Sequence, residues 1–120
     1  MRSRRGEINL YVTDLERAAR FYCDALEFTL CESEDTYRKV QQGDFTITFF
    51  LAKEKSLGEP LGQRPGMTAD ILVDDLDEAI ARIRACGGTV APVRTYDGGR
   101  FTLFRDPDGI DWELIRPDGE

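Results

Sequence analysis

The chain contains no histidine among its 120 residues. That absence excludes Ser-His-Asp and Cys-His catalysis, and with them imidazole acid–base chemistry at neutral pH. It also removes the side chain that proteins use most often to bind zinc and other transition metals. Any chemistry here must therefore use carboxylates, hydroxyls, thiols, or the side chains of Lys and Arg.

Paired cysteines and long apolar segments are also missing. The cysteines, Cys23, Cys31 and Cys86, are odd in number and form no CxxC pair, which indicates free thiols in a reducing compartment. No apolar run approaches the length that spans a bilayer, and the basic start at residues 1–5 is not followed by the apolar region of a secretory signal. We therefore expect a cytoplasmic protein with no membrane partner.

Positive charge is in the minority. There are 16 Lys and Arg residues against 23 Asp and Glu residues, so the net charge is −7 and the pI is about 4.7. This balance disfavours nucleic acid as a partner and favours a cationic ligand. The hydrophobic content of 41% and aromatic content of 10% indicate a single globular domain that builds its core without metal or disulfides.

Residues 5–52 have the pattern of a β-α-β-β-β module. Alternation of apolar and polar residues predicts strands at 7–12, 28–31, 37–40 and 45–51. Thr13 and Glu16 have the spacing of a capping box, which predicts a helix with Thr13 as its N-cap. We expect this helix to end within residues 24–28 without the usual glycine.

After a polar linker at residues 53–66, the same pattern returns in residues 67–117. Strands are predicted at 67–73, 89–94, 100–104 and 110–115, with a helix that begins at Asp74–Asp75 and stops at Gly87–Gly88. Pro107 and Gly109 predict a tight turn between the last two strands. Residues Val12, Asp14, Leu15 and Ala18 recur 61 positions later as Val73, Asp75, Leu76 and Ala79. The chain is therefore an internal duplication.

Three stretches carry a resemblance to a known family. Residues 11–22, residues 71–79, and residues 104–109 followed by Trp112-Glu113-Leu114 resemble the glyoxalase / bleomycin resistance protein / dioxygenase superfamily, also called vicinal oxygen chelate proteins. The resemblance implies an α+β fold in which two tandem β-α-β-β-β modules form an incomplete eight-stranded barrel, spanning residues 1–120 as a single domain. It also implies that the concave side holds a small ligand and that two chains associate as a homodimer.

The resemblance also implies where a metal would bind. Enzymes of the superfamily hold a divalent metal with four residues, and the matching positions here are Glu7, Thr68, about Thr48, and Glu113. Glu7 and Thr68 stand where the glyoxalases usually have histidine. Threonine is a poor metal ligand, so we expect no cofactor; the alternative is Mg²⁺ or Mn²⁺ on Glu7 and Glu113.

The faces of the predicted strands lead to the same positions. If the apolar faces pack on the helices, the other faces form an acidic cleft with some aromatic surface, which suits a cationic or aromatic ligand. Tyr96, which begins the loop at residues 96–99, and Arg100 and Phe101, which follow that loop, would flank this cleft. The remaining candidate ligand-binding residues are Glu7, Asn9, Tyr11, Thr48, Phe50, Thr68, Asp70, Asp111 and Glu113.

Three functions remain open for this cleft. The preferred one is metal-independent sequestration of a cationic or aromatic small molecule, of the bleomycin-resistance type, with no catalytic residue. The second is a Mg²⁺- or Mn²⁺-dependent lyase, isomerase, epimerase or dioxygenase in which Glu7 and Glu113 hold the ion and a metal-bound water or a glutamate of raised pKa transfers protons. The third is a non-catalytic interaction module whose acidic strand face is simply solvated.

Overall fold

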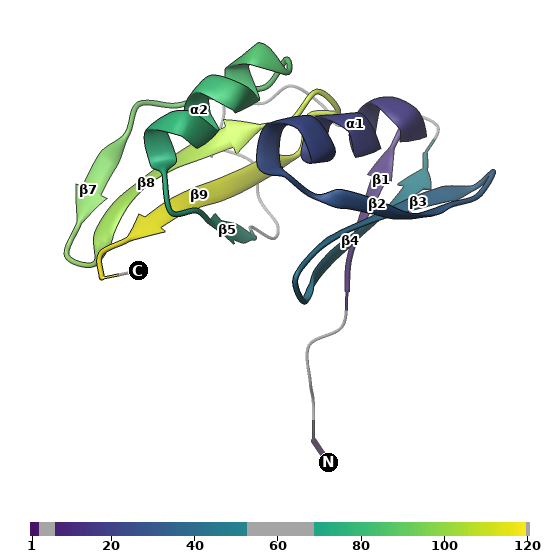
Figure 1. Cartoon of the computed structure of the whole chain (residues 1–120), viewed down its shortest axis with the longest axis horizontal. Helices are drawn as coiled ribbons and strands as arrows, with labels where there is room; N and C mark the ends of the chain where they lie inside the picture. Colours follow the sequence, from purple (N-terminus) through teal and green to yellow (C-terminus); the bar gives the residue numbers. More distant parts are fainter. Residues whose placement is uncertain (3–6, 53–68, 120) are drawn as a thin grey trace. The chain divides into compact units, whose positions relative to one another are not determined.

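The computed structural model describes residues 1–2, 7–52 and 69–119, and it has the predicted α+β architecture (Figure 1). The chain divides into two compact units, Met1–Lys55 and Ser56–Glu120. Each unit contains one helix and one sheet. The predicted linker at residues 53–66 and the candidate site residue Thr68 lie outside the described residues.

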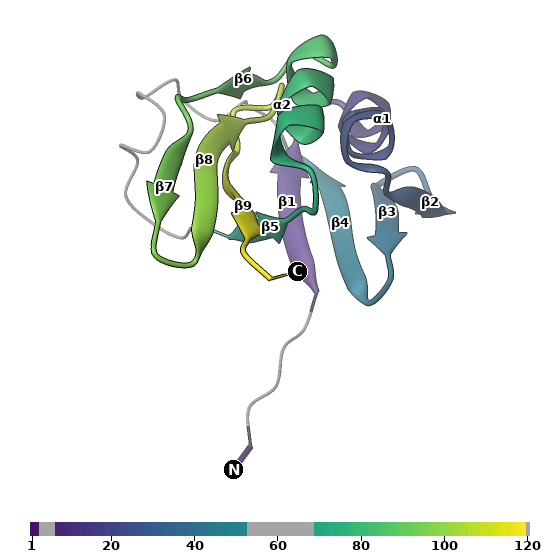
Figure 2. The same cartoon turned by 60° about the vertical axis from the view of Figure 1, so that its left-hand side comes forward.

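The first unit is a β-α-β-β-β module. Its elements are β1 (Ile8–Val12), α1 (Leu15–Leu26), β2 (Thr29–Ser33), β3 (Tyr37–Gln42) and β4 (Phe45–Leu51). The strands lie side by side in the order β1-β4-β3-β2 (Figure 2). β1 runs parallel to β4, and the other pairs are antiparallel. Every strand boundary in this unit lies within two residues of the predicted range.

Helix α1 covers one face of the first sheet and leaves the other face open. The ring of Tyr22 on the helix lies 5.1 Å from that of Phe49 on β4, and both residues are fully buried. Ile47 and Val40 are buried on the same face, because side chains two positions apart on a strand point the same way. Each such side chain contributes about 1.5–3 kcal/mol by its removal from water.

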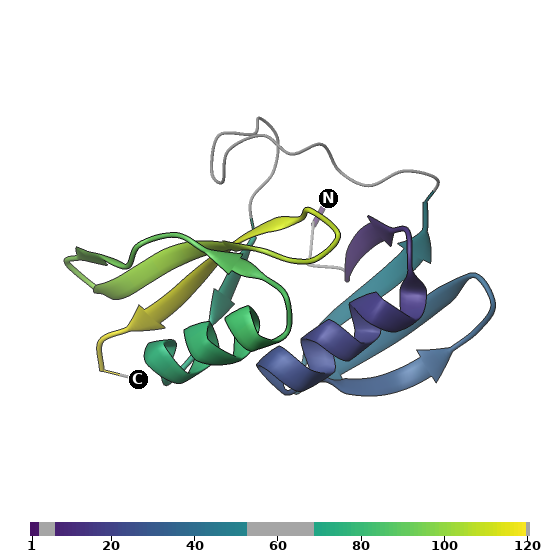
Figure 3. The same cartoon turned by 90° about the horizontal axis from the view of Figure 1, so that it is seen from above.

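The second unit repeats this plan with one more strand. Its elements are β5 (Asp70–Leu72), α2 (Leu76–Ala85), β6 (Thr89–Val90), β7 (Arg94–Tyr96), β8 (Gly99–Arg105) and β9 (Asp111–Pro117). The sheet order is β5-β9-β8-β6, with β7 also paired to β8. Figure 3 shows each helix lying across one face of its own sheet. Trp112 and Leu114 are buried, as the predicted apolar face of β9 requires, and Phe104 opposite Trp112 on β8 is buried with them.

The single strand predicted at residues 89–94 is interrupted, and that prediction is wrong in detail. β6 and β7 are separated by Ala91-Pro92-Val93, and both halves pair with β8. Pro92 explains the break, because proline has no N–H to donate to a strand ladder. The described residues therefore contain nine strands where eight were expected.

The helix starts follow the predicted positions with one correction. The N-cap of α1 is Asp14, whose Oδ1 accepts a hydrogen bond from the Arg17 N–H at 3.0 Å. The capping box predicted on Thr13 is wrong; its hydroxyl instead accepts a bond from the Arg17 guanidinium at 3.3 Å. In α2 the carboxylate of Asp75 caps the Glu78 N–H in the same way.

The helix ends agree with the sequence. α1 ends at Leu26, and its C-cap Glu27 adopts a left-handed conformation with φ of 64°, so no glycine is used there. α2 is followed by Gly87 with φ of 94°, as expected from the usual helix-terminating role of glycine. Neither helix in the described ranges is long and apolar enough to cross a lipid bilayer.

Candidate ligand-binding site

The open face of the first sheet carries four of the predicted site residues. In the ladder between β1 and β4, Asn9 lies opposite Thr48 and Tyr11 lies opposite Phe50. Residues that face each other across a ladder point to the same side of the sheet. All four therefore lie on the side away from α1, as predicted. Asn9 and Tyr11 are exposed, Phe50 is half-buried and Thr48 is buried.

Three aromatic rings form a continuous surface on this open face. The ring of Phe50 lies 6.0 Å from that of Tyr11 and 6.0 Å from that of Tyr37. These distances suit weak aromatic contacts and leave the rings tilted to one another. Tyr11 is 70% exposed. We call Tyr11, Phe50 and Tyr37 the aromatic strip.

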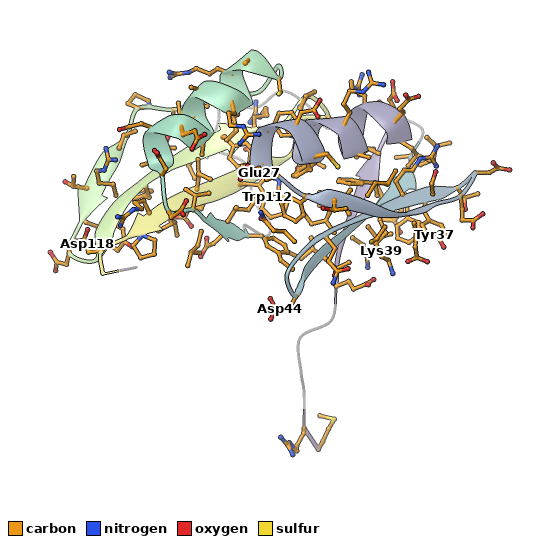
Figure 4. The ribbon with its side chains drawn as sticks, viewed as in Figure 1. Glu27, Tyr37, Lys39, Asp44, Trp112 and Asp118 are labelled. Carbon is orange, nitrogen blue, oxygen red and sulfur yellow. The ribbon has the colours of Figure 1, made fainter. Side chains whose placement is uncertain are left out.

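Beside the strip lies a cation that the sequence analysis missed. The ammonium group of Lys39 on β3 lies 3.0 Å from Oε1 of Glu7 and 2.9 Å from Oε2 of Glu32. Figure 4 shows Lys39 and Tyr37 projecting from the side of the sheet away from α1. The sequence contained a signal for this position. Counting the β3–β4 pairs back from the turn at Gly43–Asp44 places Lys39 opposite Thr48, on the face that carries the predicted site.

Hydrogen bonds connect this cation to its neighbours. The Thr48 hydroxyl donates to Oε2 of Glu7 at 3.4 Å, and the Tyr37 hydroxyl donates to Oε1 of Glu32 at 3.3 Å. The hydrogen bond and charge of Lys39 lower the pKa of Glu32, and the two carboxylates raise the pKa of Lys39. The Lys39 ammonium group and the Glu32 carboxylate therefore both stay charged at neutral pH. The ammonium group of Lys39 offsets part of the carboxylate charge of Glu7 and Glu32, so this part of the sheet face is less acidic than predicted.

On the second sheet, Asp70 and Glu113 form a carboxyl pair. They lie opposite each other in the parallel ladder between β5 and β9. A hydrogen bond with Asp70, partial burial and the charge of Asp70 together raise the pKa of Glu113. Two ionised carboxylates that face each other across a ladder repel, so protonation of one of them stabilises the pair.

The other predicted residues of this sheet divide between two roles. Asp111 accepts two bonds from Arg105, at 2.6 Å from Nε and 3.0 Å from Nη2, and therefore serves an ion pair within the β8–β9 hairpin. Phe101 lies opposite Ile115 on β9, two positions along from Glu113. Its ring contacts that of Tyr96 at 5.8 Å. Phe101 and Glu113 thus share a face, as predicted.

The strand registers match positions in the two modules. Asn9 and Asp70 occupy equivalent places on β1 and β5, and their partners across the ladder are Thr48 and Glu113. Lys39 lies opposite Thr48, and Leu103 lies opposite Glu113. The duplicated scaffold therefore presents an ammonium group in one sheet and an apolar side chain at the equivalent place in the other.

The donor groups on the described residues do not fit a divalent metal. Glu7 already accepts bonds from the Lys39 ammonium and the Thr48 hydroxyl, and the fixed cation repels a second positive ion. The hydrogen bond with Asp70, burial and the charge of Asp70 raise the pKa of Glu113, so its carboxylate form is disfavoured there. Within residues 7–52 and 69–119 no three Asp, Glu, Cys or His side chains gather as a metal site. Hard cations normally need more oxygen ligands than this.

The fold and the sequence together define the class of protein. The sequence matches the Glyoxalase/Bleomycin resistance protein/Dioxygenase superfamily over residues 4–114, so the chain belongs to this superfamily. It is 31% identical over 122 aligned residues to the uncharacterized protein YaeR of Escherichia coli strain K12. That alignment covers 89% of this chain and 91% of YaeR.

Solved structures confirm the glyoxalase-like fold. The fosfomycin resistance protein FosX of Listeria monocytogenes, in complex with Mn(II) and sulfate, has a TM-score of 0.79 at 22% identity, covering 100% of this chain and 94% of FosX. A glyoxylase/bleomycin resistance protein/dioxygenase domain from Frankia sp. EAN1pec has a TM-score of 0.75 at 22% identity. That match covers 98% of this chain and 99% of the Frankia chain.

Proposed function

We propose that this protein binds an aromatic small molecule that carries a cationic group, and sequesters it without a metal or a chemical step. The observation that carries the proposal is the aromatic strip of Tyr11, Phe50 and Tyr37 beside the carboxylates of Glu7 and Glu32. Members of the superfamily bind small molecules, and this open sheet face carries four of the residues predicted to do so here.

The physical chemistry of this face favours a flat cation over a flat anion. Each aromatic contact contributes about 0.5–1.5 kcal/mol beyond the area that it buries. A cation over the face of a tyrosine or phenylalanine ring gains about 0.5–1 kcal/mol more at an exposed site. The neighbouring ion cluster has a net negative charge, so it attracts a cation weakly and repels an anion.

The proposal includes independence from metal ions. Glu7 bonds to Lys39 and Thr48, and a divalent ion would have to displace the ammonium group. We therefore expect binding to be the same in the presence of a chelator, Mg²⁺ or Mn²⁺. The metal-dependent enzyme remains the competing function, since the similar fold of FosX is recorded with Mn(II).

Three tricyclic probes of similar size test the proposal. They are aminoacridine, which is a cation, acridone, which is neutral, and anthracenecarboxylate, which is an anion. Fluorescence titration should give the tightest binding for aminoacridine and the weakest for anthracenecarboxylate. The substitution Phe50→Ala should weaken aminoacridine binding by roughly threefold to tenfold, because one aromatic contact is lost.

A matched pair of charge variants controls for net charge. Glu7→Gln should weaken aminoacridine binding, whereas Glu16→Gln should leave it unchanged, because Glu16 lies on the exposed side of α1 and pairs with Arg20. Tighter binding of the anion, or no binding of any probe, would overturn the proposal. A requirement for Mg²⁺ or Mn²⁺ would favour the enzyme instead.

A further inference from the structure

We propose that Lys39 selects the ligand, by donating a hydrogen bond to a neutral oxygen acceptor such as a carbonyl or ether oxygen. The inference rests on the proposed function and names its ligand class more closely. The ligand would be an aromatic compound that carries a cationic group and, at a separate position, a neutral oxygen acceptor.

The position of Lys39 suits contact with a ligand. It lies on β3, an inner strand of the order β1-β4-β3-β2. Across the ladder it faces Thr48, and its neighbour on the same face of β3 is Tyr37, part of the aromatic strip. The side chain is 24% exposed, so the ammonium group is held in place and still reachable. A molecule stacked on the strip would therefore meet it.

Among the described residues, the partners of the Lys39 ammonium group use two of its three donors. A lysine ammonium has three N–H donors, and within the described part of the first unit its side-chain partners are Glu7 and Glu32. Both carboxylates are themselves held, by the hydroxyls of Thr48 and Tyr37. The third N–H therefore has a fixed origin, and a ligand oxygen can accept it without breaking either ion pair.

The surroundings of Lys39 favour a neutral acceptor over an anion. Two carboxylates flank one ammonium group, so an incoming anion meets a net negative cluster. A carbonyl or ether oxygen has no net charge, so the cluster does not repel it. It can still accept a hydrogen bond from the charged ammonium group. The same carboxylates raise the pKa of Lys39, which keeps the donor charged. The equivalent residue on the second sheet, Leu103, offers no such bond.

A purely structural role for Lys39 predicts a different outcome from a selecting role. If Lys39 only neutralises Glu7 and Glu32, its removal should leave the binding of neutral acridone unchanged, because acridone would lose no hydrogen bond. If it selects the ligand, its removal should have opposite effects on two probes. It would take a hydrogen bond away from acridone and take a repelling charge away from aminoacridine.

The test is a fluorescence titration of aminoacridine and acridone against Lys39→Met, with Arg20→Met as the matched control. Lys39→Met should weaken acridone binding about tenfold and tighten aminoacridine binding about threefold. Lys39→Arg should restore acridone binding to within about threefold of wild type, since it keeps a charged donor. Arg20→Met removes the same charge from the exposed side of α1 and should change neither affinity.

Glu32→Gln gives an independent test should Lys39→Met fail to fold. Removing this carboxylate frees a second ammonium donor, so acridone should bind more tightly and aminoacridine less tightly. Equal weakening of both probes by Lys39→Met, or an unchanged acridone affinity, would overturn the role of Lys39 alone. Failure of the wild type to bind aminoacridine would instead overturn the proposed function and this inference with it.

Discussion

At the residue scale, the two sheets differ in how they stabilise neighbouring acidic side chains. On the first sheet, the Lys39 ammonium group lies between Glu7 and Glu32 and pairs with both. On the second sheet, Asp70 and Glu113 face each other with no cation in the equivalent place, and the pKa of Glu113 rises. Pairing with Lys39 favours the charged form of Glu32, whereas the contact with Asp70 favours the protonated form of Glu113.

The raised pKa of Glu113 predicts how stability changes with pH. The folded protein holds the proton more tightly than the unfolded chain, so folding takes up a proton. The free energy of unfolding should therefore fall as the pH rises from the ordinary value of 4.5 through the raised pKa. Glu113→Gln should remove this fall and stabilise the protein near neutral pH by up to about 1 kcal/mol.

Urea denaturation of wild type and Glu113→Gln across a pH series measures this effect. The free energies of unfolding of the two proteins should converge below about pH 4, because the Glu113 carboxyl is then protonated in both the folded and the unfolded wild type. Glu16→Gln, which makes the same charge change on the exposed side of α1, serves as the control. A loss of stability in Glu113→Gln at neutral pH would show that the charged carboxylate stabilises the fold.

At the scale of elements, each helix begins at an aspartate that follows an edge strand of its sheet. Asp14 caps α1 and Asp75 caps α2, and both accept a bond from the N–H three residues later at 3.0 Å. The capping residue in α1 is therefore the one that the duplication repeats. Thr13 has a capping-box spacing, yet the actual cap belongs to the next residue because its carboxylate reaches the Arg17 N–H.

This assignment predicts unequal effects of two neighbouring substitutions. Asp14→Ala should lower the free energy of unfolding by about 1 kcal/mol, because a helix N–H loses its acceptor. Thr13→Ala should cost clearly less, since its hydroxyl bonds a partly exposed guanidinium group. Thermal and urea unfolding of both variants measures the difference. A larger cost for Thr13→Ala would restore the capping box that the sequence predicted.

The edge strand of the second sheet shows the limit of periodicity at this scale. Residues 89–94 alternate well enough to predict one strand, yet Pro92 divides it into β6 and β7. The sequence did indicate this break, because a proline within a predicted strand favours either an edge strand or an interruption of the strand. Its consequence is local, because both halves still pair with β8.

At the scale of the whole molecule, we propose a homodimer, as expected from the resemblance to small members of the superfamily. The large apolar side chains of Leu51 and Leu72 are 56% and 57% exposed in the single chain, and covering such surface is worth about 25 cal/mol per Å². Sedimentation velocity should give a mass about twice the 13.6 kDa of one chain. A mass of one chain at high protein concentration would contradict the proposal.

Much of the fold follows from local patterns. Alternation placed Val12, Trp112 and Leu114 in the core and Asn9 and Tyr11 on the open face, and burial agrees with each. Each of these patterns involves only residues that are close together in the chain, so the sequence alone is enough to predict the structure that it forms. The duplicated modules, the helix spans and the turn before β9 are of this kind.

The contacts that define the candidate site depend on strand pairing instead. The ion pair of Lys39 with Glu7 needs β1, β4 and β3 in register, and the contact of Glu113 with Asp70 needs β5 beside β9. Both bring together residues far apart in the chain. Residue order set the acidic composition and the face of each strand, whereas only the folded sheets decided which carboxylate meets a cation and which meets another carboxylate, because charge interactions depend on distance in space.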